Sequence, residues 1–175
     1  ISDEVQTGWG RTGEHFWGYQ AHGITPDLLT FAKGLGNGLT IAGVVGRAEV
    51  MDAVPANSIS TFGGNPLSSA GALANLHYLL DHGLQANAAV MGERLLAGLD
   101  PVVERHPAIG EIRGRGLMIG LELVAADGFT PDADAAGRVL EATKARRLLI
   151  GKGGLYGNCL RIAPPLSITA DECDE

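Results

Sequence analysis

Short apolar runs alternate along this sequence with longer stretches that have the period of a helix, and this alternation is what most constrains the fold. The runs at 28–32 and 41–46 predict buried strands. Asn65 followed by Pro66 supplies an N-cap and a first-turn proline, which predicts a helix that ends at Gly83. Alternating strands and helices are typical of α/β proteins.

The second half of the sequence predicts a smaller mixture of helices and strands. Apolar residues recur with a helical period from Leu84 to Leu99, and Pro101 follows them. The elements expected next are a bend at 113–116, a strand at 117–123, a helix at 132–147 and strands at 148–150 and 160–162. We therefore expect an α/β chain in two domain parts, 1–83 with a mostly parallel sheet and 84–175 of α+β type.

Both ends of the sequence suggest a piece of a longer polypeptide. The first residue is Ile1 rather than Met, and it opens what resembles the tail of a buried strand. Thr169 and Glu172 form a capping box for a helix, yet the sequence stops at Glu175. We expect an interior fragment that is inactive by itself.

Charge and cysteine content exclude several classes of partner. There are 13 basic and 20 acidic side chains, a net charge of −7, with no basic cluster, so we expect no nucleic-acid and no membrane partner. No apolar stretch approaches the ~20 residues that span a bilayer. Two cysteines and widely spaced histidines predict no metal site. A cytoplasmic location is expected from an arginine-, alanine- and glycine-rich composition typical of GC-rich bacterial genomes, and a targeting peptide stays open.

Two polar residues directly follow apolar runs, where the functional groups of α/β sheets gather. Lys33 comes between the 28–32 run and a Gly-rich turn, which predicts a poorly solvated amine suited to Schiff-base formation. The alternative is a lysine that extends its amine into solvent at a strand end. Asp3 ends another apolar run and needs a cationic partner, either a protonated pyridine nitrogen or Arg11 or Arg47.

Two further residues suggest sites for anions. Thr61 precedes the helix expected at Pro66, where free amides and a hydroxyl favour a phosphate, although Asn65 and the glycines could simply cap the helix and make the turn. Arg161 lies between apolar residues of a short strand. Its guanidinium suits the carboxylate of a substrate or of an internal Asp or Glu.

Four segments together resemble the class III branch of the pyridoxal-phosphate-dependent aminotransferases, the ω-aminotransferase family of fold type I. They are DEVQTGWGRTG at 3–13, DLLTFAKGLGNG at 27–38, STFGGNP at 60–66 and LRIAPPL at 160–166. A fifth segment, LIGKGGLYGN at 149–158, is most similar to the alanine-glyoxylate aminotransferase 2 type and to bacterial relatives labelled 4-aminobutyrate aminotransferase.

The resemblance implies pyridoxal 5'-phosphate as the cofactor and a homodimer with shared active sites. It implies that Lys33 forms a Schiff base with the cofactor and that Asp3 pairs with the pyridine nitrogen. It also implies that Val5 packs on the ring face and that Gln6 bonds the ring hydroxyl oxygen. By the same resemblance, Thr61 binds the phosphate of the opposite subunit's cofactor and Arg161 binds the substrate carboxylate.

The resemblance also implies a ping-pong transaminase. Its amino donor would be alanine, β-alanine, 4-aminobutyrate or a similar amino acid, and its acceptor glyoxylate, pyruvate or 2-oxoglutarate. The alternatives are an aminomutase, racemase or decarboxylase of the same fold, or a catalytically silent scaffold or interaction protein.

Overall fold

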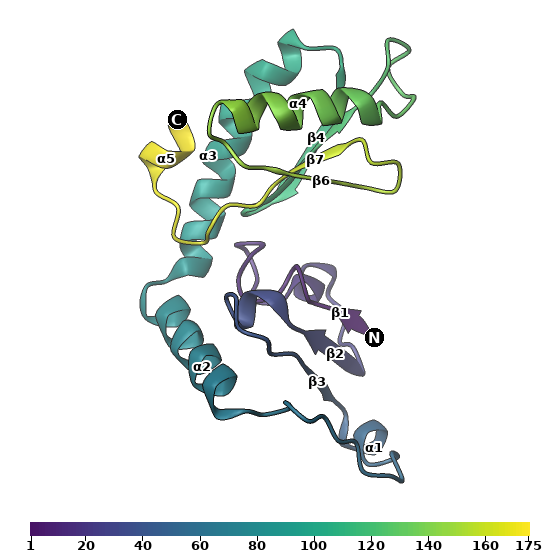
Figure 1. Cartoon of the computed structure of the whole chain (residues 1–175), viewed down its shortest axis with the longest axis vertical. Coiled ribbons are helices and arrows are strands. Elements are labelled where there is room, and N and C mark those ends of the chain that lie inside the picture. The colour runs from purple at the N-terminus through teal and green to yellow at the C-terminus, as the bar shows by residue number, and fades with distance from the viewer. The chain divides into compact units, whose positions relative to one another are not determined.

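The computed structural model describes residues 1–175, and the chain divides into two compact units, Ile1–Ala86 and Asn87–Glu175 (Figure 1). Each unit contains a sheet of its own. The division of the chain into domain parts at 1–83 and 84–175 stays a prediction. No helix is both long and apolar enough to cross a bilayer.

The first unit is built on a three-stranded sheet in the order β1-β2-β3. Strand β1 pairs parallel with β2, and β2 pairs antiparallel with β3. Its strands are β1 Ser2–Asp3, β2 Leu28–Phe31 and β3 Gly43–Gly46, and its helices are the 3-10 helices η1 Gly18–His22 and η2 Lys33–Leu35 and the α-helices α1 Ala48–Met51 and α2 Pro66–Asp81. Both strands predicted here are present, each a little shorter than its apolar run.

The capping signals of α2 are confirmed. The Asn65 side chain accepts a hydrogen bond from the Ser68 amide at 2.9 Å, and Pro66 opens the first turn. The helix ends at Asp81, and Gly83 follows with a φ of 61°, a left-handed conformation that glycine adopts without steric cost.

The second unit has an antiparallel sheet in the order β4-β5-β7-β6. Its strands are β4 Ile109–Arg115, β5 Met118–Leu123, β6 Gly151–Gly153 and β7 Cys159–Ile162, and its helices are α3 Leu84–Arg105, which starts just before the division, α4 Ala133–Ala145 and α5 Ala170–Asp174. The capping box predicted for α5 is present, with Thr169 and Glu172 bonded to each other.

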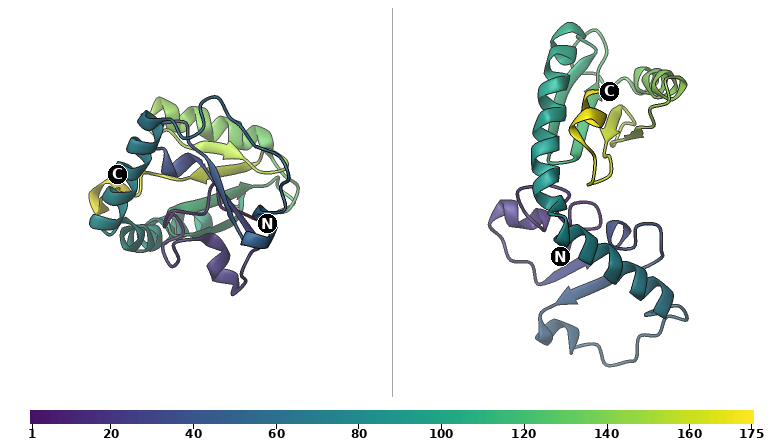
Figure 2. Two further views of the ribbon diagram at one scale, coloured as in Figure 1. Left: turned by 90° about the horizontal axis from the view of Figure 1, so that it is seen from below. Right: turned by 90° about the vertical axis from the view of Figure 1, so that its left-hand side faces the viewer.

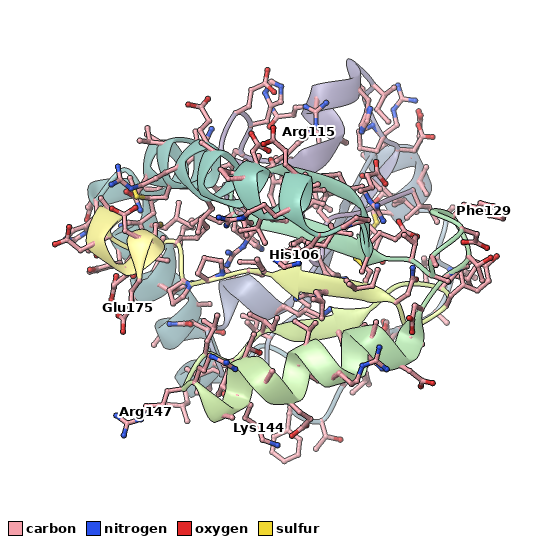
Figure 3. All side chains as sticks on the ribbon, turned by 90° about the horizontal axis from the view of Figure 1, so that it is seen from above. His106, Arg115, Phe129, Lys144, Arg147 and Glu175 are labelled. Atoms are coloured by element: carbon pink, nitrogen blue, oxygen red, sulfur yellow. The ribbon has the colours of Figure 1, made fainter.

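One face of this sheet forms the core of the second unit. Side chains of β5 and β7 pack against α4, and leucines of α3 join the same cluster. Figure 2 shows the ribbon of α4 running beside this sheet. Its buried members are Ile119, Leu121, Leu123, Ala135, Ala136 and Leu160. Polar and aromatic side chains lie outside this core: Figure 3 shows Lys144 and Arg147 pointing outward at the end of α4 and Phe129 in the loop after β5.

Two predicted boundaries are wrong. Helix α3 continues through Pro101 to Arg105, although the proline predicts an end before it. Pro101 has no N–H, so the Ala97 carbonyl loses its helical hydrogen bond. The helix continues because Ala97 is exposed to water, while Val102 and Val103 still bury part of their surface. The strand expected at 148–150 lies instead at Gly151–Gly153, because those residues pair with β7.

Gly92 of α3 packs directly on the backbone of Gly116, in the turn between β4 and β5. A methyl group at Gly92 would lie well inside van der Waals contact with the Gly116 carbonyl. We therefore expect Gly92→Ala to destabilise the protein by about 1–3 kcal/mol, although alanine favours a helix.

The matched control is Gly98→Ala in the same helix, where a Cβ meets nothing within 4 Å. That variant should be stabilised by about 0.5–1 kcal/mol. Urea unfolding of the complete gene product measures both changes, and a stabilised Gly92→Ala variant would contradict the packing argument.

Candidate active site

Asp3 and Lys33 lie at the same end of two neighbouring strands. Asp3 ends β1, and Lys33 follows the last residue of β2 by two positions. Strands β1 and β2 are parallel, with Asp3 opposite Thr30. The structure therefore places both residues at the carboxyl edge of the first sheet, where ligands of α/β sheets bind.

The Asp3 carboxylate is held by the turn that follows β1 and by β2. Its Oδ1 accepts a hydrogen bond from the Val5 amide at 3.1 Å and one from Thr30 Oγ1 at 3.4 Å. Arg47, one alternative partner, forms an ion pair with Asp27 at 3.0 Å instead. The carboxylate is thus oriented at the strand end.

Lys33 has a backbone conformation that is uncommon for a residue with a side chain. Its φ is 36°, in the left-handed region, and its carbonyl accepts the Gly36 amide at 3.1 Å. Such a conformation costs about 1–3 kcal/mol and persists where the surroundings fix it. Asn75 of α2 does so here, because its Nδ2 donates to the carbonyls of Gly34 at 2.8 Å and Leu35 at 3.1 Å.

The expectation that Lys33 and Asp3 are poorly solvated is wrong for this chain, because both residues are exposed. The physical reason is their position. Strand β1 is a two-residue edge strand, and Lys33 lies beyond the end of β2 rather than within it. Val5 is half-buried and Gln6 is exposed.

An aromatic cluster packs at the end of β2. Trp9, Phe16, Trp17 and Phe31 contact one another with ring centroids 4.7 to 6.4 Å apart. Phe31 is the last residue of β2, so the cluster ties the 9–19 loop to the strand that leads into Lys33.

The residue that the sequence reasoning missed is Glu4. Its side chain is 2% exposed, and its carboxylate accepts four hydrogen bonds. The donors are Thr7 Oγ1 at 2.6 Å, the Gly18 amide at 2.7 Å, the Tyr19 amide at 2.8 Å and Ser2 Oγ at 2.9 Å. Burial raises the pKa of Glu4, but these hydrogen bonds together outweigh it and hold the pKa below its ordinary value.

The sequence alone contains no sufficient signal for Glu4, because its inward direction follows only once Asp3 is known to be exposed. Successive residues of a strand point to opposite sides, so an exposed Asp3 implies an inward Glu4. The loop at Gly18 lies very close to the turn at Thr7, since a Cβ at Gly18 would lie 2.6 Å from Cβ of Thr7. A buried carboxylate is stable only with such donors.

The segment before α2 has the geometry of a cap and turn. Besides capping the helix, Asn65 donates through Nδ2 to the Phe62 carbonyl at 3.0 Å, and Gly64 has a φ of 67°. Thr61 is exposed in this segment. The capping alternative thus accounts for Asn65 and the glycine, and phosphate binding by Thr61 stays a prediction.

Arg161 belongs to the second unit. It is exposed on β7, directly opposite Gly120 of β5 and Gly151 of β6. Directly opposite residues lie on the same face of a sheet, so this arginine has a glycine on either side.

The chain has the fold of the type I pyridoxal-phosphate-dependent enzymes. A phospholyase from Arthrobacter in complex with phosphoethanolamine has a similar structure, with a TM-score of 0.92 and 38% identity over 99% of this chain and 42% of its own. The chain belongs to the class-III aminotransferase family, whose model matches residues 1–175.

Two relatives are similar along the chain. "Alanine--glyoxylate aminotransferase 2 homolog 2, mitochondrial" of Arabidopsis thaliana is 44% identical over 99% of this chain and 37% of its own length. The 4-aminobutyrate aminotransferase of Escherichia coli K12 is 42% identical over 96% of this chain and 40% of its own. The chain thus spans well under half the length of these relatives, and the resemblance seen in its motifs is confirmed.

The buried carboxylate makes a prediction about acid stability. Because the folded-state pKa of Glu4 is lowered, its stabilisation is present above the unfolded-state value near 4.5 and is lost as the pH falls through the folded value. Glu4→Gln leaves the two backbone amides poorly paired, so we expect a loss of about 2–4 kcal/mol at pH 7 that shrinks towards pH 3.

Denaturant unfolding of the complete gene product at several pH values measures this difference. Exposed Glu93 supplies the control, because Glu93→Gln should change stability by less than about 0.5 kcal/mol at any pH. A Glu4→Gln deficit that does not vary with pH would contradict the charge-based account.

Proposed function

We propose that the protein containing this chain transfers an amino group from an amino acid to an oxo acid with pyridoxal 5'-phosphate. The observation that carries the proposal is the placement of Asp3 and Lys33 at the carboxyl ends of neighbouring parallel strands. Membership of the class-III aminotransferase family supports it.

The chemistry of the donor set fits this cofactor. The aldehyde of the cofactor reacts with an amine, and its pyridine nitrogen pairs with a carboxylate. Lys33 and Asp3 supply these two groups, and both are exposed at one sheet edge. When bound, pyridoxal phosphate withdraws electrons from the substrate carbon whose proton is removed. Family members use this cofactor.

Lys33 would hold the cofactor covalently through Nζ and, once displaced by the substrate amine, would move a proton as general base and then general acid. Its left-handed backbone, held by Asn75, gives the side chain a fixed starting direction from the end of β2. That fixed origin matters because proton transfer requires the amine within hydrogen-bond reach of the reacting carbon.

Asp3 would keep the pyridine nitrogen protonated, since a carboxylate favours a positive charge beside it. Its Oδ1 is bonded to Val5 and Thr30, which orients the group. Val5 would pack on the ring face and Gln6 would bind the ring hydroxyl oxygen.

The remaining assignments concern the second copy and the substrate. Thr61 would bind the phosphate of the opposite subunit's cofactor, which makes a homodimer with shared active sites part of the proposal. Arg161 would bind the substrate carboxylate through its guanidinium fork. Residues 1–83 would complete the cofactor domain of a cytoplasmic enzyme, and residues 84–175 would belong to its small domain.

For substrates we propose small amino acids such as alanine, β-alanine or 4-aminobutyrate as donors, with glyoxylate, pyruvate or 2-oxoglutarate as acceptors. The names of the two relatives support this range. Initial rates with each donor and acceptor would identify the pair.

One observation favours a second candidate reaction. The similar Arthrobacter structure is a phospholyase, so this fold also supports a lyase reaction. Release of phosphate from phosphoethanolamine without amino transfer to any oxo acid would favour that candidate over the transaminase.

The chain contains three lysines, which gives the test of Lys33 its controls. Borohydride reduction of the complete gene product with cofactor should fix the cofactor on the peptide that contains Lys33. We expect Lys33→Ala to abolish this adduct and to lower amino transfer by about 10³-fold or more, because nucleophile and proton carrier are lost together.

Mass mapping of the reduced protein locates the adduct. Lys144→Ala and Lys152→Ala should keep both adduct and activity, because Lys144 Nζ forms an ion pair with Glu141 at 2.7 Å and Lys152 Nζ donates to the Ala133 carbonyl at 3.1 Å. Labelling at either of them, or an intact adduct in Lys33→Ala, would refute the assignment.

A further inference from the structure

Arg161 shares one face of the second sheet with Arg113 and Glu122. Gly120 lies opposite both Arg113 of β4 and Arg161 of β7, so the two arginines share a row and a face. Their strands are two apart, or about 10 Å between backbones at the usual strand spacing. Glu122 lies two residues beyond Gly120 on the same face, diagonal to both arginines.

Glu122 is therefore a diagonal neighbour of both arginines, and diagonal neighbours are about 7–8 Å apart at the backbone. The structure pairs it with Arg113, whose Nη1 lies 2.6 Å from Glu122 Oε2. The other carboxylate oxygen accepts a bond from Asn158 Nδ2 at 3.3 Å. Both oxygens of Glu122 are thus engaged, one by Arg113 of β4 and one by Asn158, which directly precedes β7.

Glu111 explains why Arg113 is the preferred partner. Glu111 lies directly opposite Glu122, and two like charges in that position repel. Arg113 donates to both carboxylates, so one guanidinium relieves the repulsion. Hydrogen bonding to Glu122 raises the pKa of Arg113, and the same bond lowers the pKa of Glu122.

We propose that Arg113 is a positioning residue that holds Glu122 back from Arg161, so that Arg161 can bind the carboxylate of a small amino-acid or oxo-acid substrate. The proposal rests on the proposed function, in which Arg161 binds that carboxylate. Without Arg113, Glu122 is left next to Arg161 with a second carboxylate behind it, and both repel an incoming anion.

The pair is suited to placement rather than to stability. The side chains of Arg113 and Glu122 are 49% and 29% exposed, and exposed ion pairs contribute little to the free energy of unfolding. A variant at Arg113 should therefore fold normally, which makes an effect on ligand binding readable.

The test measures the dissociation constant of propionate, a carboxylate without an amine, by titration calorimetry on the complete gene product loaded with cofactor. Arg113→Gln should raise this constant about tenfold, with the melting temperature unchanged within about 3 °C. For alanine as donor, KM should rise by a similar factor while kcat stays within about twofold.

The double variant Arg113→Gln/Glu122→Gln should restore propionate binding to within about twofold of the parent protein, because the competing carboxylate is gone. Arg115→Gln is the matched control, since it also removes one positive charge from β4, at a position that lies opposite Met118 rather than opposite Gly120. Equal weakening by Arg115→Gln, or no rescue in the double variant, would overturn the proposal.

Arg161→Gln separates this inference from the proposed function. If Arg161→Gln weakens propionate binding but Arg113→Gln does not, the positioning role is wrong and the substrate role of Arg161 stands. If Arg161→Gln leaves binding unchanged, the carboxylate assignment of Arg161 fails, and the role of Arg113 fails with it.

Discussion

The buried carboxylate of Glu4 is the interaction on which the first unit depends. It joins β1 to the loop at 7–19 through donors that come from before and after it in the sequence. Because neighbouring residues of a strand point to opposite sides, fixing Glu4 inward also fixes Asp3 outward at the sheet edge. The position of the proposed cofactor carboxylate is therefore set by the adjacent residue, which has no chemical part in the reaction.

The same logic applies to Lys33, whose direction is set by residues that do not react. Its left-handed backbone opens η2, and the carbonyls of that turn are bonded to Asn75 of α2. The helix is in turn fixed at its start by the Asn65 cap. A strained residue at a proposed site is thus supported by a helix that begins more than thirty residues later, a form of preorganisation that local sequence does not reveal.

Local rules predicted the elements whose ends depend on nearby residues. The Asn65-Pro66 cap, the Thr169 capping box and β7 could be located because capping and short apolar runs act within a few residues. The continuation of α3 through Pro101 could not be predicted, because it depends on whether the carbonyl that loses its hydrogen bond is exposed to water. Nor could the burial of Glu4, whose amide donors lie 14 and 15 residues away and are brought near only by the folded loop.

Glu4 and Glu122 show why two carboxylates held on both oxygens have different consequences. Around Glu4 water is excluded, so loss of its charge leaves backbone amides unpaired and stability falls. Around Glu122 water is present, so the ion pair with Arg113 adds little free energy and mainly decides where a negative charge lies. An exposed contact of this kind therefore directs charge, whereas a buried one is required for stability. Glu122 is a diagonal neighbour of Arg161, about 7–8 Å away at the backbone, so the place of its charge bears on which anions that arginine accepts.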